Sequence, residues 1–417
     1  MSNFVTNPWR ERNGRTSTFV IAASNSLHKA SADYICGGVD DQVEVQKAID
    51  ALPDIGGKIS FLAGEYRFRD TITCTKPIHL QGEGYNWHTQ GGLTRFYPQS
   101  ALSNSPLFVF EGSWYVGEMS DIGVDGFEAG SHTGRLFELH ASGGDFQINR
   151  CGWYYCEWDT IIHSIAHNIW ISDSFFEVNG NSNLNNAVVD IESGDRNRIL
   201  NCHFRANNCN YDFRTTAAQN WVVGSDFNGS TQKCLYLGSS VGFISNCFMI
   251  NLNDVAISIV SSYQNINNCM INTYNTSAVT VGDRTGLVIV ANDINSHTEL
   301  AIDGVGDTTN IIMCNSLRGT GAKLTTGVQG RVCNNTGHTT ETSGTATITS
   351  ANTSIIVTHG LSATPTAGDI MVTPAEALGA ATSFWVDTYA ADTFVIHVNT
   401  APGSDVTFAW KAVIATA

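Results

Sequence analysis

A short phrase recurs through the middle of the chain at a nearly constant interval. It consists of apolar residues, then Asn or Ser beside Cys, and then Phe or another apolar residue. Its central residues are Cys151, Ser174, Cys202, Ser225, Cys247, Cys269, Asn292 and Asn315. Successive members lie 23, 28, 23, 22, 22, 23 and 23 residues apart. A period of this length is typical of a solenoid, in which each turn buries its apolar face against the next turn.

A second phrase runs in step with the first, so each turn carries two or three short strands. Its clearest copies are LFELH (136–140), TIIH (160–163), VDIE (189–192), YDFR (211–214) and CLYLG (234–238). The pattern predicts an all-β fold, a right-handed parallel β-helix, with equivalent residues stacked about 4.8 Å apart. The LxxLxL spacing of leucine-rich repeats is absent, and a propeller blade needs about 40 residues. The one interval of 28 predicts an inserted loop, VNGNSNLNNA (178–187).

Charge and cysteine content narrow the range of partners. The 417 residues include 38 acidic and 22 basic side chains, a formal charge of -16, which argues against a nucleic-acid partner. No apolar run approaches the roughly 18 residues of a membrane-spanning helix, and the first residues lack the apolar stretch of a secretory signal. The 11 cysteines include no CxxC pair. They predict reduced core thiols and a reducing cytosol as the place of synthesis, with no disulfide framework or zinc site.

Residues 32–68 have a different character from the repeat. Two aspartates precede VEVQKAIDAL, which predicts a short amphipathic helix with Val43, Val45, Ile49 and Leu52 on its apolar face. Pro53 and two glycines end it, and KISFLAGEYRF then reads as strand, turn and strand. The stretch resembles the N-terminal cap of the pectate-lyase-like β-helix superfamily, especially its phage tailspike and appendage members. The matching residues are Asp40, Asp41, Gln46, Ala48, Ile49, Gly56, Gly57, Ile59, Phe61, Gly64 and Tyr66.

The resemblance implies a phage tailspike-like depolymerase, a homotrimer that binds and cleaves a bacterial surface polysaccharide. Such a protein would be part of the virion tail and be made in the host cytoplasm. The superfamily contains hydrolases, lyases, isomerases and non-enzymes, so glycoside hydrolysis and β-elimination both stay open. The alternatives are a non-catalytic receptor-binding or structural spike and a free pectate-lyase-like enzyme. No cofactor is expected, except Ca²⁺ if the chain is a lyase.

The repeat stops near residue 338, and the sequence beyond it alternates differently. TTETSGT (339–345) has the composition of a linker. Residues 346–417 carry five or six alternating runs, which predict a small β-sandwich for trimerisation or for receptor or carbohydrate binding. The predicted domains are an N-terminal segment (1–30), the capped β-helix (31–338), the linker (339–345) and the sandwich (346–417).

Ionisable residues that point outward concentrate on the turns between about 136 and 230. In the first strand of each turn, one predicted row consists of Gly152, Phe175, His203 and Asp226. The other row of this strand consists of Tyr154, Glu177, Arg205 and Asn228. In the second strand, one predicted row consists of Glu138, Ile161, Asp190, Asp212 and Tyr236. The other row consists of His140, His163, Glu192, Arg214 and Gly238. The inserted loop and the aromatic stretch GWYYCEWDT (152–160) fall on the same turns.

These rows predict a carbohydrate site. Asp190 and Asp212 would lie about 5 Å apart on adjacent turns, and like charges that close push one pKa up, which supplies an acid and a base. Glu192 and Glu177 are the alternative catalytic acids. The predicted substrate-binding residues are Tyr154, Tyr155, Trp158, His163, Arg205, Arg214 and Asp226. Aromatic faces beside carboxylates suit a sugar ring and its glycosidic bond. No metal site is predicted.

Overall fold

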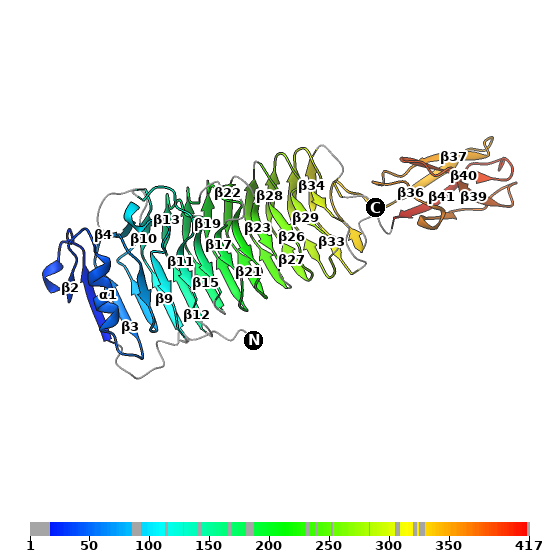
Figure 1. Ribbon diagram of the computed structural model, residues 1–417. Coiled ribbons are helices and arrows are strands. Elements are labelled where there is room, and N and C mark those ends of the chain that lie inside the picture. The colour runs from blue at the N-terminus through cyan, green and yellow to red at the C-terminus, as the bar shows by residue number, and fades with distance from the viewer. Residues whose placement is uncertain are drawn as a thin grey trace. The chain divides into compact units, whose positions relative to one another are not determined.

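A computed structural model describes residues 17–414, except 86–92, 113–115, 128, 141–143, 166–167, 181–186, 231–232, 239–240, 252, 283, 305–308, 320–322 and 325–329. Over these residues the chain is nearly all-β: a right-handed parallel β-helix with one α-helix, followed by a small antiparallel β-sandwich (Figure 1). The predicted fold class is confirmed. The chain divides into two compact units, 1–261 and 262–417, and each is described separately below.

In the first unit each full turn adds one strand to each of three parallel sheets. Sheet A runs β2 (Tyr34–Ile35), β1 (Ser17–Ala22), β3 (Gly57–Phe61), β6 (Ile78–Gln81), β9 (Val116–Ser120), β12 (Asp145–Asn149), β15 (Asn168–Ser172), β18 (Asn197–Leu200), β21 (Asn220–Val223), β24 (Gly242–Ser245). Sheet B runs β4 (Gly64–Phe68), β7 (Thr94–Pro98), β10 (Gly123–Asp125), β13 (Gly152–Tyr154), β16 (Phe175–Glu177), β19 (His203–Arg205), β22 (Asp226–Ser230), β25 (Phe248–Asn251). Sheet C runs β5 (Ile72–Cys74), β8 (Phe108–Phe110), β11 (Arg135–Leu139), β14 (Thr160–Ser164), β17 (Ala187–Ile191), β20 (Tyr211–Thr215), β23 (Lys233–Leu237), β26 (Ile257–Ile259).

The second unit repeats this pattern and then changes to antiparallel pairing. Its parallel strands are β27 (Gln264–Asn267), β28 (Met270–Thr273), β29 (Val279–Val281), β30 (Val288–Val290), β31 (Asp293–Ser296), β32 (Ile302–Asp303), β33 (Ile311–Met313), β34 (Ser316–Gly319) and β35 (Arg331–Cys333). One antiparallel sheet has the strand order β36 (Glu341–Ile348), β41 (Val406–Val413), β38 (Ile370–Pro374). The other has the order β37 (Ser354–Thr358), β40 (Thr393–Val398), β39 (Phe384–Asp387). Phe394, Ile396 and Phe408 are fully buried in the shared apolar core of these two sheets.

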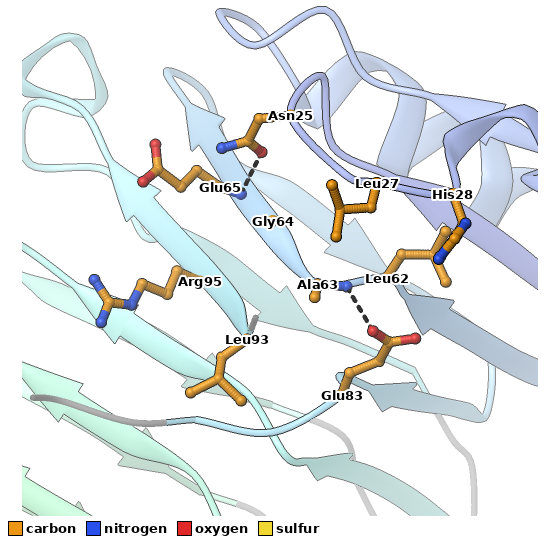
Figure 2. A pocket seen from close by; sticks show the side chains of 10 residues that line it. All are labelled: Asn25, Leu27, His28, Leu62, Ala63, Gly64, Glu65, Glu83, Leu93 and Arg95. Carbon is orange, nitrogen blue, oxygen red and sulfur yellow. Dashed lines mark hydrogen bonds between the residues drawn. The ribbon is translucent and has the colours of Figure 1, made fainter. Parts of the chain in front are cut away.

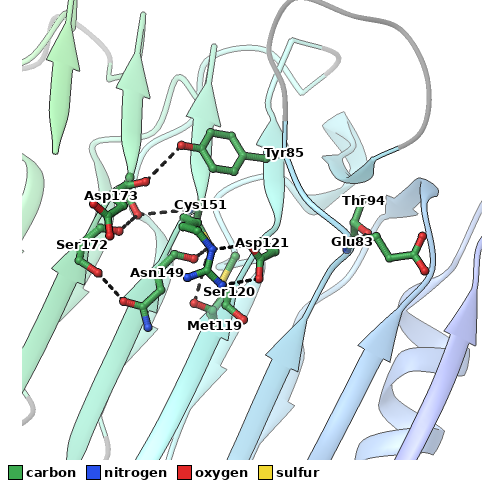
Figure 3. A network of polar contacts seen from close by, with 12 residues as sticks. Glu83, Tyr85, Thr94, Met119, Ser120, Asp121, Asn149, Cys151, Ser172 and Asp173 are labelled. Carbon is green, nitrogen blue, oxygen red and sulfur yellow. Dashed lines mark hydrogen bonds and ion pairs between the residues drawn. The ribbon is translucent and has the colours of Figure 1, made fainter. Parts of the chain in front are cut away.

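The recurring phrase of the sequence forms a tight corner between sheets A and B. The residue before each central residue has a positive φ, such as 50° at Arg150, 51° at Asp173 and 52° at Asn201. This left-handed conformation turns the chain and directs the next side chain into the interior. The Cys151 amide then donates to Ser174 Oγ of the next turn at 3.2 Å. The polar residues of this corner are stacked along the β-helix (Figure 3).

Aromatic rings form a continuous stack behind sheet B. Trp153, Phe176, Phe204 and Phe227 occupy one register position on successive strands. Their ring centroids are 4.7, 4.7 and 4.8 Å apart, and the rings are within 7° of parallel. The spacing equals that of neighbouring strands, so each turn continues the packing of the previous one. This stack fixes the register of the outward side chains on the same strands.

The predicted capping helix is α1 (Gln42–Asp50), which contacts the first strands of the first unit (Figure 1). Gln46 pairs with the exposed edge of β5: its amide nitrogen donates to the Thr73 carbonyl at 3.0 Å, and its oxygen accepts from the Thr73 amide at 2.9 Å. An open edge that would otherwise pair with another chain is thereby satisfied. Val45 and Ile49 are buried as predicted, but Val43 is exposed.

Two segments differ from their predicted roles. Residues 17–22 of the predicted N-terminal segment are β1, which pairs with β3 in sheet A, because Phe19 and Ile21 lie opposite Ile59 and Phe61. Residues 1–16 lie outside the described residues. Part of the predicted linker is also wrong, since β36 begins at Glu341 and pairs with β41. Its alternating Thr and Ser side chains suit a strand with one solvent-facing side.

The cysteines provide a test of the inward register. Nine of the 11 are buried, while Cys314 is exposed and Cys333 is partly exposed. Burial raises the pKa of Cys151 and of Cys202 to about 12, which suppresses the reactive thiolate. We expect a thiol reagent to label Cys314 first in the native protein, and the buried nine only after denaturant is added. Mass spectrometry of labelled peptides measures this order, and early labelling of Cys202 would contradict the register.

Candidate functional site

The predicted site residues divide between two sheets. The outward rows of sheet B are confirmed: Phe175, His203 and Asp226 are paired in register, and so are Tyr154, Glu177 and Arg205. The rows of sheet C are shifted from the prediction. Glu138 is followed by His163, Asp190, Arg214 and Tyr236 on successive strands. The structure therefore contains two separate groups of polar side chains, on different faces of the first unit.

The proposed pairing of Asp190 with Asp212 is wrong. Asp190 lies opposite Arg214, whereas Asp212 is fully buried and accepts a hydrogen bond from Asn207 Nδ2 at 2.9 Å. Several strands of sheet C, including β11, β20 and β23, have two consecutive inward residues before the outward one, such as Asp212 and Phe213 before Arg214. A prediction from strict in-and-out alternation does not include this extra inward residue. The predicted row therefore contains Ile161 in β14 and Asp212 in β20, where the structure has His163 and Arg214.

Two of the predicted aromatic residues are buried, although Tyr154 stands in an outward row of sheet B. Trp158 is 0% exposed, and its ring lies 4.5 Å from that of His132. Tyr154 is also buried, at 6% exposure. Tyr155 is exposed, at 43%, and takes a positive φ of 52° at the corner after β13. Trp158 is therefore a core residue, and of these three only Tyr155 offers an open ring.

The sheet B cluster comprises the outward residues Tyr154, Phe175, Glu177, His203, Arg205 and Asp226. Phe175 lies between two other rings, with its centroid 6.0 Å from that of Tyr154 and 5.8 Å from that of His203. Arg205 Nη1 lies 3.5 Å from Glu177 Oε1, and His203 Nδ1 lies 3.6 Å from Asp226 Oδ2. The cluster thus combines a half-exposed aromatic surface with two carboxyl groups, each beside a basic side chain.

Asp226 is the unusual member of this cluster. Its side chain is 34% exposed, but Oδ1 is buried and has no hydrogen-bond partner among the described residues. Burial raises the pKa of Asp226, although His203 and Arg205 partly oppose the shift. A raised pKa is the direction of shift that suits a carboxyl group to act as a general acid.

The sheet C cluster comprises Arg135, Glu138, His140, His163, Asp190, Glu192 and Arg214. Arg214 binds Asp190 through a two-pronged contact, with Nε 2.8 Å from Oδ1 and Nη2 2.5 Å from Oδ2. This hydrogen-bonded pair raises the pKa of Arg214, and Asp190 is 3% exposed. Asp190 is therefore paired with Arg214 through one hydrogen bond on each oxygen, which weakens the prediction that Asp190 is the catalytic acid.

His163 and Glu192 form the other part of the sheet C cluster. His163 Nε2 lies 3.2 Å from Glu192 Oε1, a contact that becomes an ion pair when the imidazole is protonated. Burial lowers the pKa of His163, and the charge of Arg135 lowers it further. Arg135 lies between two carboxylates, 3.7 Å from Glu138 and 3.8 Å from Glu192. The sequence analysis did not select Arg135, although it directly precedes the LFELH phrase.

A cavity of about 470 Å³ lies near the N-terminal end of the first unit, and none of the predicted site residues lines it (Figure 2). Two of its polar side chains already bind backbone: Glu83 accepts from the Ala63 amide at 3.0 Å, and Asn25 accepts from the Glu65 amide at 2.9 Å. Most of the inserted loop predicted to flank the site, residues 181–186, lies outside the described residues.

Comparison with solved structures gives matches across most of the chain. The tailspike protein gp49 of Pseudomonas phage LKA1 matches with a TM-score of 0.54 and 10% identity, over 90% of this chain and 93% of that one. ORF18 of Geobacillus virus E2 matches with a TM-score of 0.50 and 18% identity, over 89% and 73%. A mutant of the DFA-IIIase of Arthrobacter chlorophenolicus A6 matches with a TM-score of 0.50 and 12% identity, over 73% and 86%.

At these identities the matches show a shared fold, the parallel β-helix. No protein-family model matches the chain, and a search of curated proteins gives no match either. Among the described residues, no helix is long and apolar enough to cross a membrane.

The raised pKa of Asp226 predicts a pH-dependent effect on stability. Since the folded state holds this proton more tightly than the unfolded state, the wild type loses stability as pH rises from about 4 through the folded pKa. Asp226→Asn removes that loss, so we expect it to gain thermal stability relative to wild type between pH 4 and pH 7. Melting curves across this range measure the difference.

Asp293→Asn is the matched control, because Asp293 is another outward carboxylate of sheet B with a basic partner, Arg318, where Asp226 has His203. It should show no gain. A lower melting temperature for Asp226→Asn than for wild type at pH 7 would contradict the assignment.

Proposed function

We propose that this protein binds and cleaves a bacterial surface polysaccharide by hydrolysing a glycosidic bond at the sheet B cluster. The observation that carries the proposal is Asp226, a partly exposed carboxyl group whose pKa is raised by burial. It stands in an outward row with Phe175 and His203, whose rings offer a surface for the apolar face of a sugar.

In this proposal Asp226 donates its proton to the glycosidic oxygen as the bond to the anomeric carbon breaks. Glu177 accepts a proton from the attacking water, whose oxygen forms the new bond to the anomeric carbon. Arg205 Nη1 lies 3.5 Å from Glu177 Oε1 and positions that carboxyl group. Each turnover consumes one water and releases a new reducing end.

The placement of the two carboxyl groups favours inversion of the anomeric centre. Glu177 is on β16 and Asp226 on β22, with β19 between them. Two strand spacings of about 4.8 Å separate these strands by roughly 9.6 Å, and Glu177 stands in the row of Asn228, two residues along β22 from Asp226. The two carboxyl groups of a retaining enzyme are about 5 Å apart, whereas those of an inverting enzyme are about 6.5–9.5 Å apart to admit a water molecule. The backbone separation here is far wider than a retaining pair uses, so in this proposal water attacks the anomeric carbon directly.

The fold shared with the tailspike protein of phage LKA1 supports a further proposal, that the chain is a homotrimer in a virion tail. We expect light scattering to give three times the 45.0 kDa of one chain. A mass of 45.0 kDa at the concentrations used for assay would contradict the trimer without bearing on hydrolysis.

Asp226→Asn is expected to lower turnover by about 10²–10⁴-fold, the usual effect of losing a general acid or base, while glycan binding persists. The assay is release of reducing ends from a panel of capsular polysaccharides and lipopolysaccharides. Absorbance of unsaturated uronates is read in parallel, because β-elimination would produce them and hydrolysis would not.

Two variants serve as controls for this assay. Asp293→Asn should keep full activity, since it removes an outward carboxylate of a different turn. If Glu192→Gln abolishes cleavage and Asp226→Asn does not, the active centre is the sheet C cluster. Binding without cleavage of any glycan would favour the non-catalytic spike.

A further inference from the structure

His163, Asp190 and Glu192 bring three potential ligand atoms together on the outside of sheet C. One atom from each side chain, an imidazole nitrogen and two carboxylate oxygens, lies within 4.8 Å of the others. Asp190 follows His163 directly in the row, and Glu192 comes two residues after Asp190. The sheet itself therefore sets this grouping.

His163 supplies an independent reason to consider a ligand here. The residue is 1% exposed, Nδ1 has no hydrogen-bond partner among the described residues, and Nε2 has only its 3.2 Å contact with Glu192. Buried polar atoms without a partner are uncommon, and an ion or an ordered water is a usual explanation. Nε2 is the nitrogen directed toward Glu192.

We propose that His163, Asp190 and Glu192 bind a divalent transition-metal ion of the Zn²⁺ class. One imidazole and two carboxylates are common ligands of Zn²⁺. Ca²⁺ prefers six to eight oxygen ligands, so a buried imidazole disfavours it. Three protein ligands leave at least one coordination position on the open side of Glu192, where water or a sugar oxygen can bind.

The surrounding charges are compatible with a bound cation. Asp190 is held by Arg214, and such a partner orients a ligating carboxylate while leaving lone pairs for the metal. Arg135 is the competing cation, but its contact with Glu192 is long, at 3.8 Å, and its side chain is 38% exposed. It can move into solvent when an ion binds. Glu138, on the other side of Arg135, retains that guanidinium as a partner.

Isothermal titration of Zn²⁺ into the chelator-treated full-length protein tests the site. We expect one Zn²⁺ per chain, and no comparable binding of Ca²⁺. Glu192→Gln removes an exposed ligand with little risk to folding, and should weaken Zn²⁺ binding by at least about 10–100-fold, the loss typical of even an indirect partner of a metal. His163→Ala should do the same, and circular dichroism checks that it folds.

His140→Ala is the matched control, because His140 lies on the same face, 3.5 Å from Glu138, but outside the three ligands. It should bind Zn²⁺ as wild type does. The proposal is overturned if wild type binds no Zn²⁺, or if Glu192→Gln and His140→Ala bind it as tightly as wild type, since binding then occurs at other surface groups. None of these titrations depends on the sheet B cluster, so they are independent of the proposed hydrolysis.

Discussion

The tight left-handed corner between sheets A and B is the constraint on which the rest of the first unit depends. It recurs once per turn, and the residue after it points inward to meet its counterpart in the next turn. Where that counterpart is Ser174 or Ser225, its hydroxyl accepts the amide of Cys151 or Cys202 and satisfies a buried donor. A second corner, after sheet B, uses Asn179 in the same way, since it accepts from the Cys156 amide.

These corners have a direct consequence for function. By fixing the register of each strand, they arrange outward side chains in rows whose spacing is that of the backbone ladder. Unlike charges become neighbours without any dedicated loop, as with Glu177 beside Arg205 and Asp190 beside Arg214. The interior needs only repeated small and aromatic residues, so the exterior is free to vary. A β-helix can therefore carry different chemistry on each sheet, here an aromatic and acidic group on sheet B and a histidine and carboxylate group on sheet C.

The sequence predicted what depends on the period and failed where the path within a turn is irregular. The period predicted the fold and the rows of sheet B, including Glu177 beside Arg205. The rows predicted for sheet C were wrong because two consecutive residues of the strand turn inward there, which buries Asp212. The prediction also treated Trp158 as a surface ring, since periodicity does not reveal which corner residues fold back into the core. The burial of His163 and its position beside Glu192 depend on side-chain geometry and have no signal in the sequence.

The central claim is that a glycan binds to and is cleaved at the outward rows of sheet B. The most direct measurement is a crystal structure of Asp226→Asn with an oligosaccharide of a polysaccharide that the wild type cleaves. We expect a sugar ring against Phe175 and His203, with a glycosidic oxygen within hydrogen-bond distance of residue 226. An oligosaccharide bound only at the sheet C cluster, or only in the cavity beside Glu83, would contradict it.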